Sequence, residues 1–282
     1  MDSANVNGIA IAYEDSGSAV PAAGAEGGPA VLFVHGHPFD RTMWRPQVEE
    51  LVRRGVRAVA PDLRGYGGTT VVPGVVPLET FARDLAGLLD RLGMARAVVC
   101  GVSMGGQIAL EFHRLFPGRV AGLLLADTFA QGETPAGKRE RNERADRLLA
   151  EGMAGYAHEV LDKMITPANV AAMPAVAAHV LAMMLGAPPE GAAAALRGRA
   201  ERPDYTGTLA GIGVPALVVV GRDDVFTPVA DAEFLRERIP GARLAVVEGA
   251  GHLPNLERPA AFNAALTGLL AAVAAATDVT EV

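Results

Sequence analysis

The stretch that decides the fold runs from Val98 to Gly106 and reads VVCGVSMGG. Apolar residues precede it, and apolar residues follow it at a helical spacing. At the junction stands the pattern G-x-S-x-G, here Gly101–Gly105, which predicts a strand, a sharp turn and a helix with Ser103 at the apex. Glycines are needed because such a strained turn leaves little room for Cβ atoms beside the strand and the helix. Ser103 Oγ would then stand at a helix N-terminus, where backbone N–H groups and the helix dipole favour a developing negative charge.

The same pattern also arises by chance, since the chain contains 33 glycines, so its meaning depends on the rest of the sequence. Short apolar segments that we expect to form strands recur along the chain. They are residues 30–34, 57–61, 95–100, 120–126, 215–221 and 243–247. Helical patterns lie between most of them, and continuously apolar strands that alternate with helices are typical of a parallel sheet with helices on both faces. The sequence therefore predicts an α/β fold, with an edge strand or hairpin at Val6–Tyr13 and a loop at 17–29.

This alternation stops near Phe129 and resumes at Pro215, and the interval between them contains no convincing strand. We therefore divide the chain into a first core part (1–130), an inserted helical cap (131–203) and a second core part (204–282). A cap inserted there would lie over the carboxyl ends of the strands, where open α/β sheets place their ligands.

Two groups of residues in the expected cap have a structural as well as a functional interpretation. Methionine suits the lining of an adaptable apolar pocket, although any one of these side chains is more often a core residue. The cap methionines are Met153, Met164, Met173, Met183 and Met184. We interpret the charges of a helix expected at Lys138–Leu149 as a solvated face. These charges are Arg139, Glu140, Arg141, Glu143 and Arg144.

A serine hydroxyl is a weak nucleophile and needs a general base, which needs a group that orients it. His252 follows the last expected strand on a loop of small residues, so it would reach the same end of the sheet as Ser103. The other histidines outside the first core loop are interpreted as structural or surface residues. They are His113, His158 and His179.

The acid is expected at the end of another strand, between nucleophile and base along the chain. Asp223 and Asp224 directly follow the strand expected at 215–221, and Asp127 follows the strand at 120–126. Asp224 is the first candidate, and Asp127 and Asp223 are the alternatives.

Acyl transfer also needs donors for the tetrahedral oxyanion. Met104 follows the nucleophile and would supply one backbone N–H, and His37, in the loop after the strand at 30–34, would supply the other. In an alternative interpretation His35 and His37 form a metal pair, but no third ligand is evident nearby in the sequence, so no metal is expected.

Composition excludes several classes of function. The net charge is −7, and no cluster of lysine and arginine is interleaved with aromatics, so neither nucleic acid nor an anionic membrane is an expected partner. No uninterrupted apolar run reaches 18 residues, and the segment Met1–Asn5 is unlike the start of a signal peptide. The single cysteine, Cys100, excludes an internal disulfide framework and fits a reducing compartment, so we expect a cytoplasmic protein.

Taken together, these features resemble the α/β-hydrolase family over nearly the whole chain. The motifs that carry the resemblance are His35–Pro38, Asp62–Gly67, Gly101–Gly106, Gly221–Pro228 and Gly251–His252. The resemblance implies that Asp224 is the acid of the triad and that the Asp62–Gly67 loop is structural. The segment Gly251–Pro259, with Phe262, looks most like 3-oxoadipate enol-lactonases and small carboxylesterases. Serine at the turn, rather than aspartate, is unlike haloalkane dehalogenases and epoxide hydrolases.

We therefore expect a serine hydrolase that cleaves an ester or lactone of a small, partly apolar molecule without a cofactor. Its pocket is expected to draw on apolar side chains near the strand ends. They are Phe39, Trp44, Phe129, Phe226 and Leu253. Carbon–carbon bond hydrolases, perhydrolases (haloperoxidases) and lyases with similar triads remain alternatives, and so does a non-catalytic ligand receptor on the same fold. The sequence leaves monomer and homodimer equally open.

Overall fold

The computed structural model describes residues 1–19 and 30–278, and within them the chain forms one eight-stranded sheet. The strands are β1 (Asp2–Val6), β2 (Ile9–Asp15), β3 (Val31–Val34), β4 (Ala58–Pro61), β5 (Ala97–Val102), β6 (Val120–Ala126), β7 (Ala216–Gly221) and β8 (Arg243–Val247). Their order across the sheet is β1-β2-β4-β3-β5-β6-β7-β8. From β4 to β8 all neighbours are parallel, whereas β1 and β2 are antiparallel, so the expected mostly parallel α/β sheet is confirmed.

An N-terminal hairpin forms the antiparallel edge. Asn7 and Gly8 link β1 to β2 and both have positive φ angles, 48° and 77°, as a tight two-residue hairpin turn requires. The hairpin is longer than the segment Val6–Tyr13 that alternation indicated. Of the loop expected at 17–29, residues 20–29 lie outside the described part of the chain.

Helices cover both faces of the sheet and also form an insertion at one of its ends. They are α1 (Arg45–Arg53), α2 (Leu78–Arg91), α3 (Met104–Leu115), α4 (Pro135–Glu151), α5 (Ala154–Met164), α6 (Pro167–Ala172), α7 (Pro174–Gly186), α8 (Pro189–Ala200), α9 (Val229–Arg238), α10 (Pro254–Glu257) and α11 (Pro259–Asp278). Short 3₁₀ turns add Ser16–Ala19, Arg41–Trp44, Pro117–Arg119 and Thr206–Gly211.

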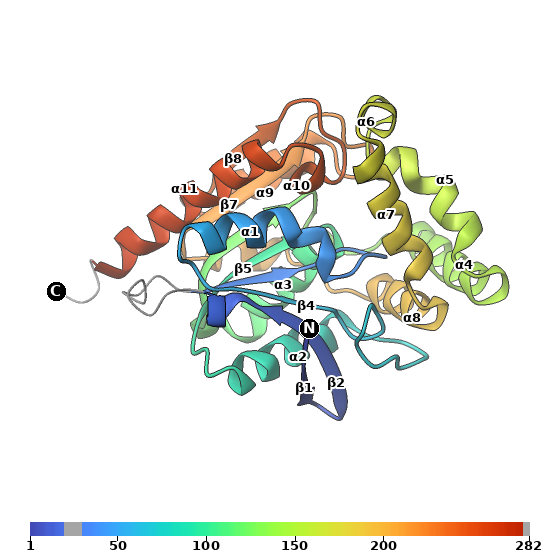
Figure 1. The fold of residues 1–282 in the computed structure, drawn as a ribbon, viewed down its shortest axis with the longest axis horizontal. Coiled ribbons are helices and arrows are strands. Elements are labelled where there is room, and N and C mark those ends of the chain that lie inside the picture. The colour runs from blue at the N-terminus through green and yellow to red at the C-terminus, as the bar shows by residue number, and fades with distance from the viewer. Residues whose placement is uncertain (20–29, 279–282) are drawn as a thin grey trace.

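Two glycines show which helix lies on which face. A Cβ on Gly101 of β5 would meet Gly105 of α3, and a Cβ on Gly122 of β6 would meet Val273 of α11. Gly122 pairs with Val98, which faces away from Gly101 because side chains alternate along a strand. α3 and α11 therefore pack on opposite faces, and Figure 1 shows α2 beside α3 and α1 beside α11.

The helices α4 to α8 form the insertion between β6 and β7, and Figure 1 shows them together at one end of the sheet. The inserted helical cap is therefore confirmed as an element of the fold, while the division of the chain at residues 131 and 203 stays a prediction. The serine strand is two residues further along than expected, because Gly101 and Val102 pair with β6 instead of opening the turn.

One helix of the described chain, α11, has the length and hydropathy that could span a membrane over Pro259–Ala276. Its apolar side packs on the sheet, since α11 contacts β6, β7 and β8. Phe262, Leu266 and Val273 on that side are fully or almost fully buried. The helix thus serves as one layer of the α/β fold in this structure.

Candidate active site

Ser103 stands at a strained turn between β5 and α3. Its φ angle is +57°, a value that non-glycine residues rarely adopt. Ser103 N–H donates to Ala126 O (2.9 Å) and Thr128 Oγ1 donates to Ser103 O (2.8 Å), so the end of β6 holds the turn. A Cβ at Gly105 would lie 2.1 Å from Val34 O, so the turn needs glycine there. The turn therefore presents Ser103 at the start of α3.

A buried histidine–aspartate pair lies at the carboxyl ends of β7 and β8. His252 Nδ1 is 2.8 Å from Asp224 Oδ2, and both side chains are almost fully buried. Asp224 also accepts from Thr227 Oγ1 and from Phe226 N–H. Burial works to raise the pKa of the Asp224 carboxyl, but His252 and these hydrogen bonds outweigh it, and the pKa lies below its usual value. Asp224 is thus an ionised carboxylate that can fix the tautomer of His252.

The two other candidate acids occupy different positions. Asp223 is exposed, whereas Asp127 is buried and its Oδ1 accepts from Gly221 N–H (2.9 Å). Burial, and then the neighbouring Asp224, raise the pKa of Asp127 well above its usual value, which favours the neutral form of this carboxyl. The structure brings Asp224 to His252 and adds Asp127 as a buried neighbour.

The same cluster has the spacing of a possible metal site, since ligand atoms of Asp127, Asp224 and His252 lie within 4.8 Å of one another. However, Asp224 Oδ2 already accepts from two donors, and Asp127 Oδ1 from one. The donor set therefore fits an internal hydrogen-bond network better than a cation.

The backbone amides expected to hold an oxyanion lie close to the nucleophile. Met104 opens α3, where first-turn amides have no intrahelical acceptor, and His37 follows β3. Within the described chain neither amide donates to another group, and His37 and Ser103 line the same cavity.

The side chains of His35 and His37 do not act as a pair. His35 Nε2 accepts from Leu63 N–H (2.9 Å), so Nδ1 carries the proton and donates to Gly36 O (2.9 Å). His37 Nδ1 instead contacts the Tyr66 hydroxyl at 2.7 Å. Because both ring nitrogens of His35 are engaged, it is neutral and unavailable to a metal.

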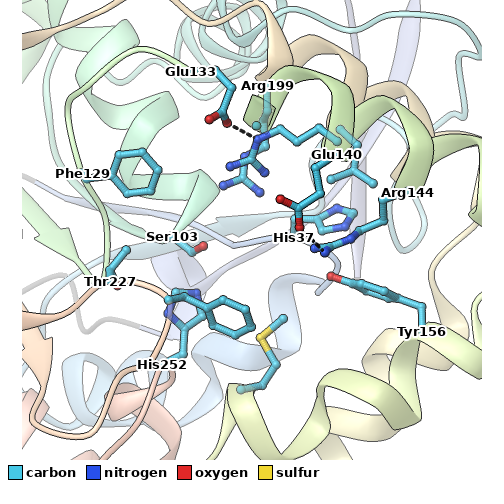
Figure 2. Close-up of a pocket in the computed structure, with 15 residues that line it drawn as sticks. His37, Ser103, Phe129, Glu133, Glu140, Arg144, Tyr156, Arg199, Thr227 and His252 are labelled. Carbon is cyan, nitrogen blue, oxygen red and sulfur yellow. Dashed lines mark hydrogen bonds and ion pairs between the residues drawn. The ribbon is translucent and has the colours of Figure 1, made fainter. Parts of the chain in front are cut away.

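These groups surround a cavity of about 260 Å³ under the inserted helices. Figure 2 shows Ser103, His37 and His252 around it, with Tyr156 of α5 at its edge. Phe129 and Phe226 line the cavity, as does Met164 among the five cap methionines.

Three residues expected in the pocket lie elsewhere. Phe39, Trp44 and Leu253 are fully buried in the core and do not line this cavity. Trp44 stacks on Phe33 with ring centroids 4.7 Å apart, because the 3₁₀ turn that carries it packs back on β3. The sequence located these aromatics near the right strands but could not give the direction of their side chains.

Known proteins share the sequence pattern and the fold of this chain. The model of the "Alpha/beta hydrolase family" matches residues 31–265. The chain belongs to the alpha/beta hydrolase family. This alpha/beta hydrolase is 29% identical over 250 residues to 3-oxoadipate enol-lactonase 1 of Acinetobacter baylyi, covering 89% of this chain and 91% of that one.

Solved structures agree with the sequence comparison. A malate-bound thermophilic esterase from Thermogutta terrifontis is similar with a TM-score of 0.89 and 40% identity, covering 96% of this chain and 97% of that chain. The enol-lactonase from Burkholderia xenovorans LB400 gives a TM-score of 0.87 and 29% identity, covering 96% and 100%. The resemblance inferred from the motifs is therefore confirmed at the level of the family.

Sequence reasoning missed the charged side of the alpha/beta hydrolase cavity. Arg141 and Arg144, expected on a solvated face of α4, line it together with Arg199 of α8. Helix α4 packs along α8, and this contact turns part of its charged face inward over the strand ends. The available signal was Arg199 itself, a charge in a helix otherwise rich in alanine and glycine.

Proposed function

We propose that this alpha/beta hydrolase is a serine hydrolase that cleaves a carboxylic ester or a lactone of a small molecule. The observation that carries the proposal is the buried pair of His252 and Asp224 beside a strained Ser103 in one cavity. Similarity to enol-lactonases and esterases supports the same bond type.

The chemistry follows from the groups around Ser103. His252 takes the proton of Ser103 Oγ as the hydroxyl attacks the carbonyl carbon, and Asp224 stabilises the imidazolium that forms. The amides of His37 and Met104 donate to the oxyanion of the tetrahedral intermediate. His252 then gives its proton to the leaving alkoxide, which leaves an acyl group on Ser103. Water, deprotonated by His252, releases the acid and restores the serine.

The test is hydrolysis of p-nitrophenyl esters with acyl chains from acetate to decanoate by the wild type and by Ser103→Ala. We expect a measurable rate that falls by at least about 10³-fold in Ser103→Ala, because the covalent step is lost. Asp224→Asn should fall strongly too, whereas the matched control Asp223→Asn, which changes the exposed neighbour, should keep the wild-type rate.

A folded wild type that shows neither a burst nor turnover with any ester or lactone would refute the proposal. Cleavage of a β-dicarbonyl compound between two carbons, abolished by Ser103→Ala, would instead support the carbon–carbon hydrolase alternative. Tight ligand binding without any turnover would support a receptor.

A further inference from the structure

Arg199 is a buried guanidinium in the cavity that contains Ser103. Its relative exposure is 7%, and its Nε donates to Gln107 Oε1 (3.1 Å). In the part of the chain that the structure describes, no carboxylate forms an ion pair with it. A buried charge without an opposite partner is unfavourable, so such an arrangement points to a partner that arrives from outside.

Arg202, a second buried arginine near this cavity, has a carboxylate partner within the chain. Arg202 Nη1 lies 2.7 Å from Glu133 Oε2, and Arg141 binds the same carboxylate. Burial works to raise the pKa of Glu133, but the two guanidinium groups lower it to about 2. Glu133 is therefore saturated by other arginines and is not available to Arg199.

The entrance of the cavity adds to the positive charge. Arg144 lines it and pairs with Glu140 at 3.0 Å, but the Glu140 side chain is 70% exposed, so water screens that pair. Three guanidinium groups, from Arg141, Arg144 and Arg199, thus line the cavity with two carboxylates, Glu133 and Glu140, in a chain whose net charge is −7. The cavity is locally positive on a protein that is negative as a whole.

His37 lies close enough to these arginines for their positive charge to affect its pKa. Burial lowers it most, and Arg199, Arg141 and Arg144 lower it further. His37 belongs to the oxyanion loop, so the positive region reaches the place where the scissile carbonyl would bind.

The position of Arg199 relative to the nucleophile is fixed by α3. Gln107 lies one turn after Ser103, and Gln107 N–H donates to Ser103 O (3.2 Å). The side chain of the same Gln107 holds Arg199, so the guanidinium and the nucleophile share one rigid support. Figure 2 shows Arg199 and His252 on opposite sides of Ser103 in this view.

We propose that Arg199, assisted by Arg141 and Arg144, binds a carboxylate of the substrate, so that the preferred substrates are small esters or lactones that keep a free carboxylate away from the reacting carbonyl. A carboxylate suits the site because a guanidinium binds its two oxygens with two parallel hydrogen bonds. This inference rests on the proposed function, since it says what binds the end of the substrate that lies away from the carbonyl attacked by Ser103.

The test compares substrates that differ in one charge. Mono-p-nitrophenyl esters of glutaric and adipic acid carry a free carboxylate, and their methyl esters are neutral and of similar shape. We expect the wild type to prefer at least one acid over its methyl ester in kcat/KM. Arg199→Met should lower kcat/KM for that acid by about 100-fold, mainly through KM, because a buried charge-assisted hydrogen-bond pair is lost. The neutral esters should change by less than about 3-fold.

Matched variants keep the result interpretable. Arg197→Met removes an arginine from the same helix that pairs with Asp146 instead, and it should leave the preference unchanged. If Arg199→Met does not fold, Arg199→Lys and Arg141→Gln should each reduce the preference for the acid without abolishing turnover of the methyl ester.

Equal kcat/KM values for acid and methyl ester in the wild type, or an equal loss on both in Arg199→Met, would overturn the inference. If no ester is cleaved, the proposed function fails separately. Calorimetric titration of free glutarate and adipate then decides the inference: binding that Arg199→Met abolishes and Arg197→Met preserves supports it, and no binding overturns it.

Discussion

At the scale of single residues, the site separates the ionisation of two neighbouring carboxyls. His252 and donors from its own loop lower the pKa of Asp224, while burial and the neighbouring Asp224 raise the pKa of Asp127 and favour its neutral form. The Asp127 Oδ2 atom has no donor in the described structure, so a proton on it can point to the Asp224 carboxylate. Asp127 would then act as a positioning residue that helps to hold Asp224 beside His252.

Asp127→Asn should therefore be well tolerated, because an amide keeps the acceptor for Gly221 N–H and offers an N–H to Asp224. Asp127→Ala removes both and should lower the free energy of unfolding by about 1–3 kcal/mol, since it leaves a buried N–H unpaired. Thermal unfolding and kcat of the two variants check this. Equal losses in Asn and Ala variants would show that the charge of Asp127, rather than its hydrogen bonds, is what the fold uses.

The residues also differ in how far the sequence could locate them. The motif around Ser103 and the strand-end positions of Asp224 and His252 are local patterns, so the sequence could place all three at the carboxyl ends of the strands. Arg199 stands out as a charge in a helix rich in alanine and glycine, but the sequence could not show that it lacks a carboxylate partner, because its neighbours in the structure, such as Gln107, are far away along the chain. Trp44 could be placed near the strand ends but not assigned to the core, because the direction of its side chain depends on how its 3₁₀ turn packs on β3.

At the scale of elements, one buried carboxylate joins the loop that carries His252 to the inserted helices. Glu257 of α10 accepts from Gly251 N–H (2.7 Å), next to His252, and from Thr166 N–H (3.0 Å) and Asn169 Nδ2 (2.6 Å) at α6. The position of the cap and the position of the His252 loop are therefore set by the same side chain. The sequence predicted an inserted helical cap, but it could not predict that a residue of α10 would bind α6.

We expect Glu257→Gln to lower kcat about 10-fold and the melting temperature by several degrees, because the amide has one acceptor oxygen in place of two for these three N–H donors, and its NH2 group faces a donor. The control is Glu248→Gln, which removes an exposed carboxylate paired with Arg222 at the end of β8. The two variants are compared by thermal unfolding and by ester hydrolysis. A melting temperature of Glu257→Gln equal to that of Glu248→Gln would contradict the link.

At the scale of the whole molecule, the parallel sheet brings loops from distant parts of the chain to the carboxyl ends of its strands, and the inserted helices cover these loops. Continuous apolar strands predicted this sheet because such strands must be buried on both faces. The number and contacts of the cap helices were beyond the sequence, since alanine-rich helices give little periodic signal. The expected reducing compartment stays a prediction.

Burial also makes the stability of the whole fold depend on pH. Desolvation lowers the pKa values of His35, His37 and His113 below their usual value, so the folded chain keeps them neutral at a pH where the unfolded chain binds protons. The stability they contribute is fully present above the unfolded pKa, about 6.5, and is lost as the pH falls toward their folded values. Asp224 and Glu133, whose pKa values are also lowered, act in the same direction at lower pH, below the usual carboxylate range.

His37→Gln should therefore make stability less dependent on pH below about 6.5, the usual pKa of an imidazole in the unfolded chain, because one buried group no longer has to stay neutral. One such histidine contributes a slope of at most about 1.4 kcal/mol per pH unit, so the variant should lose up to that much of the wild-type slope. Urea unfolding at several pH values measures it, and His158→Gln, which changes an exposed imidazole, should keep the wild-type slope. The backbone amide of His37 is unchanged in the variant, so hydrolysis can be followed in parallel to show that the site still forms. A slope for His37→Gln that matches both the wild type and His158→Gln would mean that His37 binds protons equally in the folded and unfolded chains, so that burial does not lower its pKa.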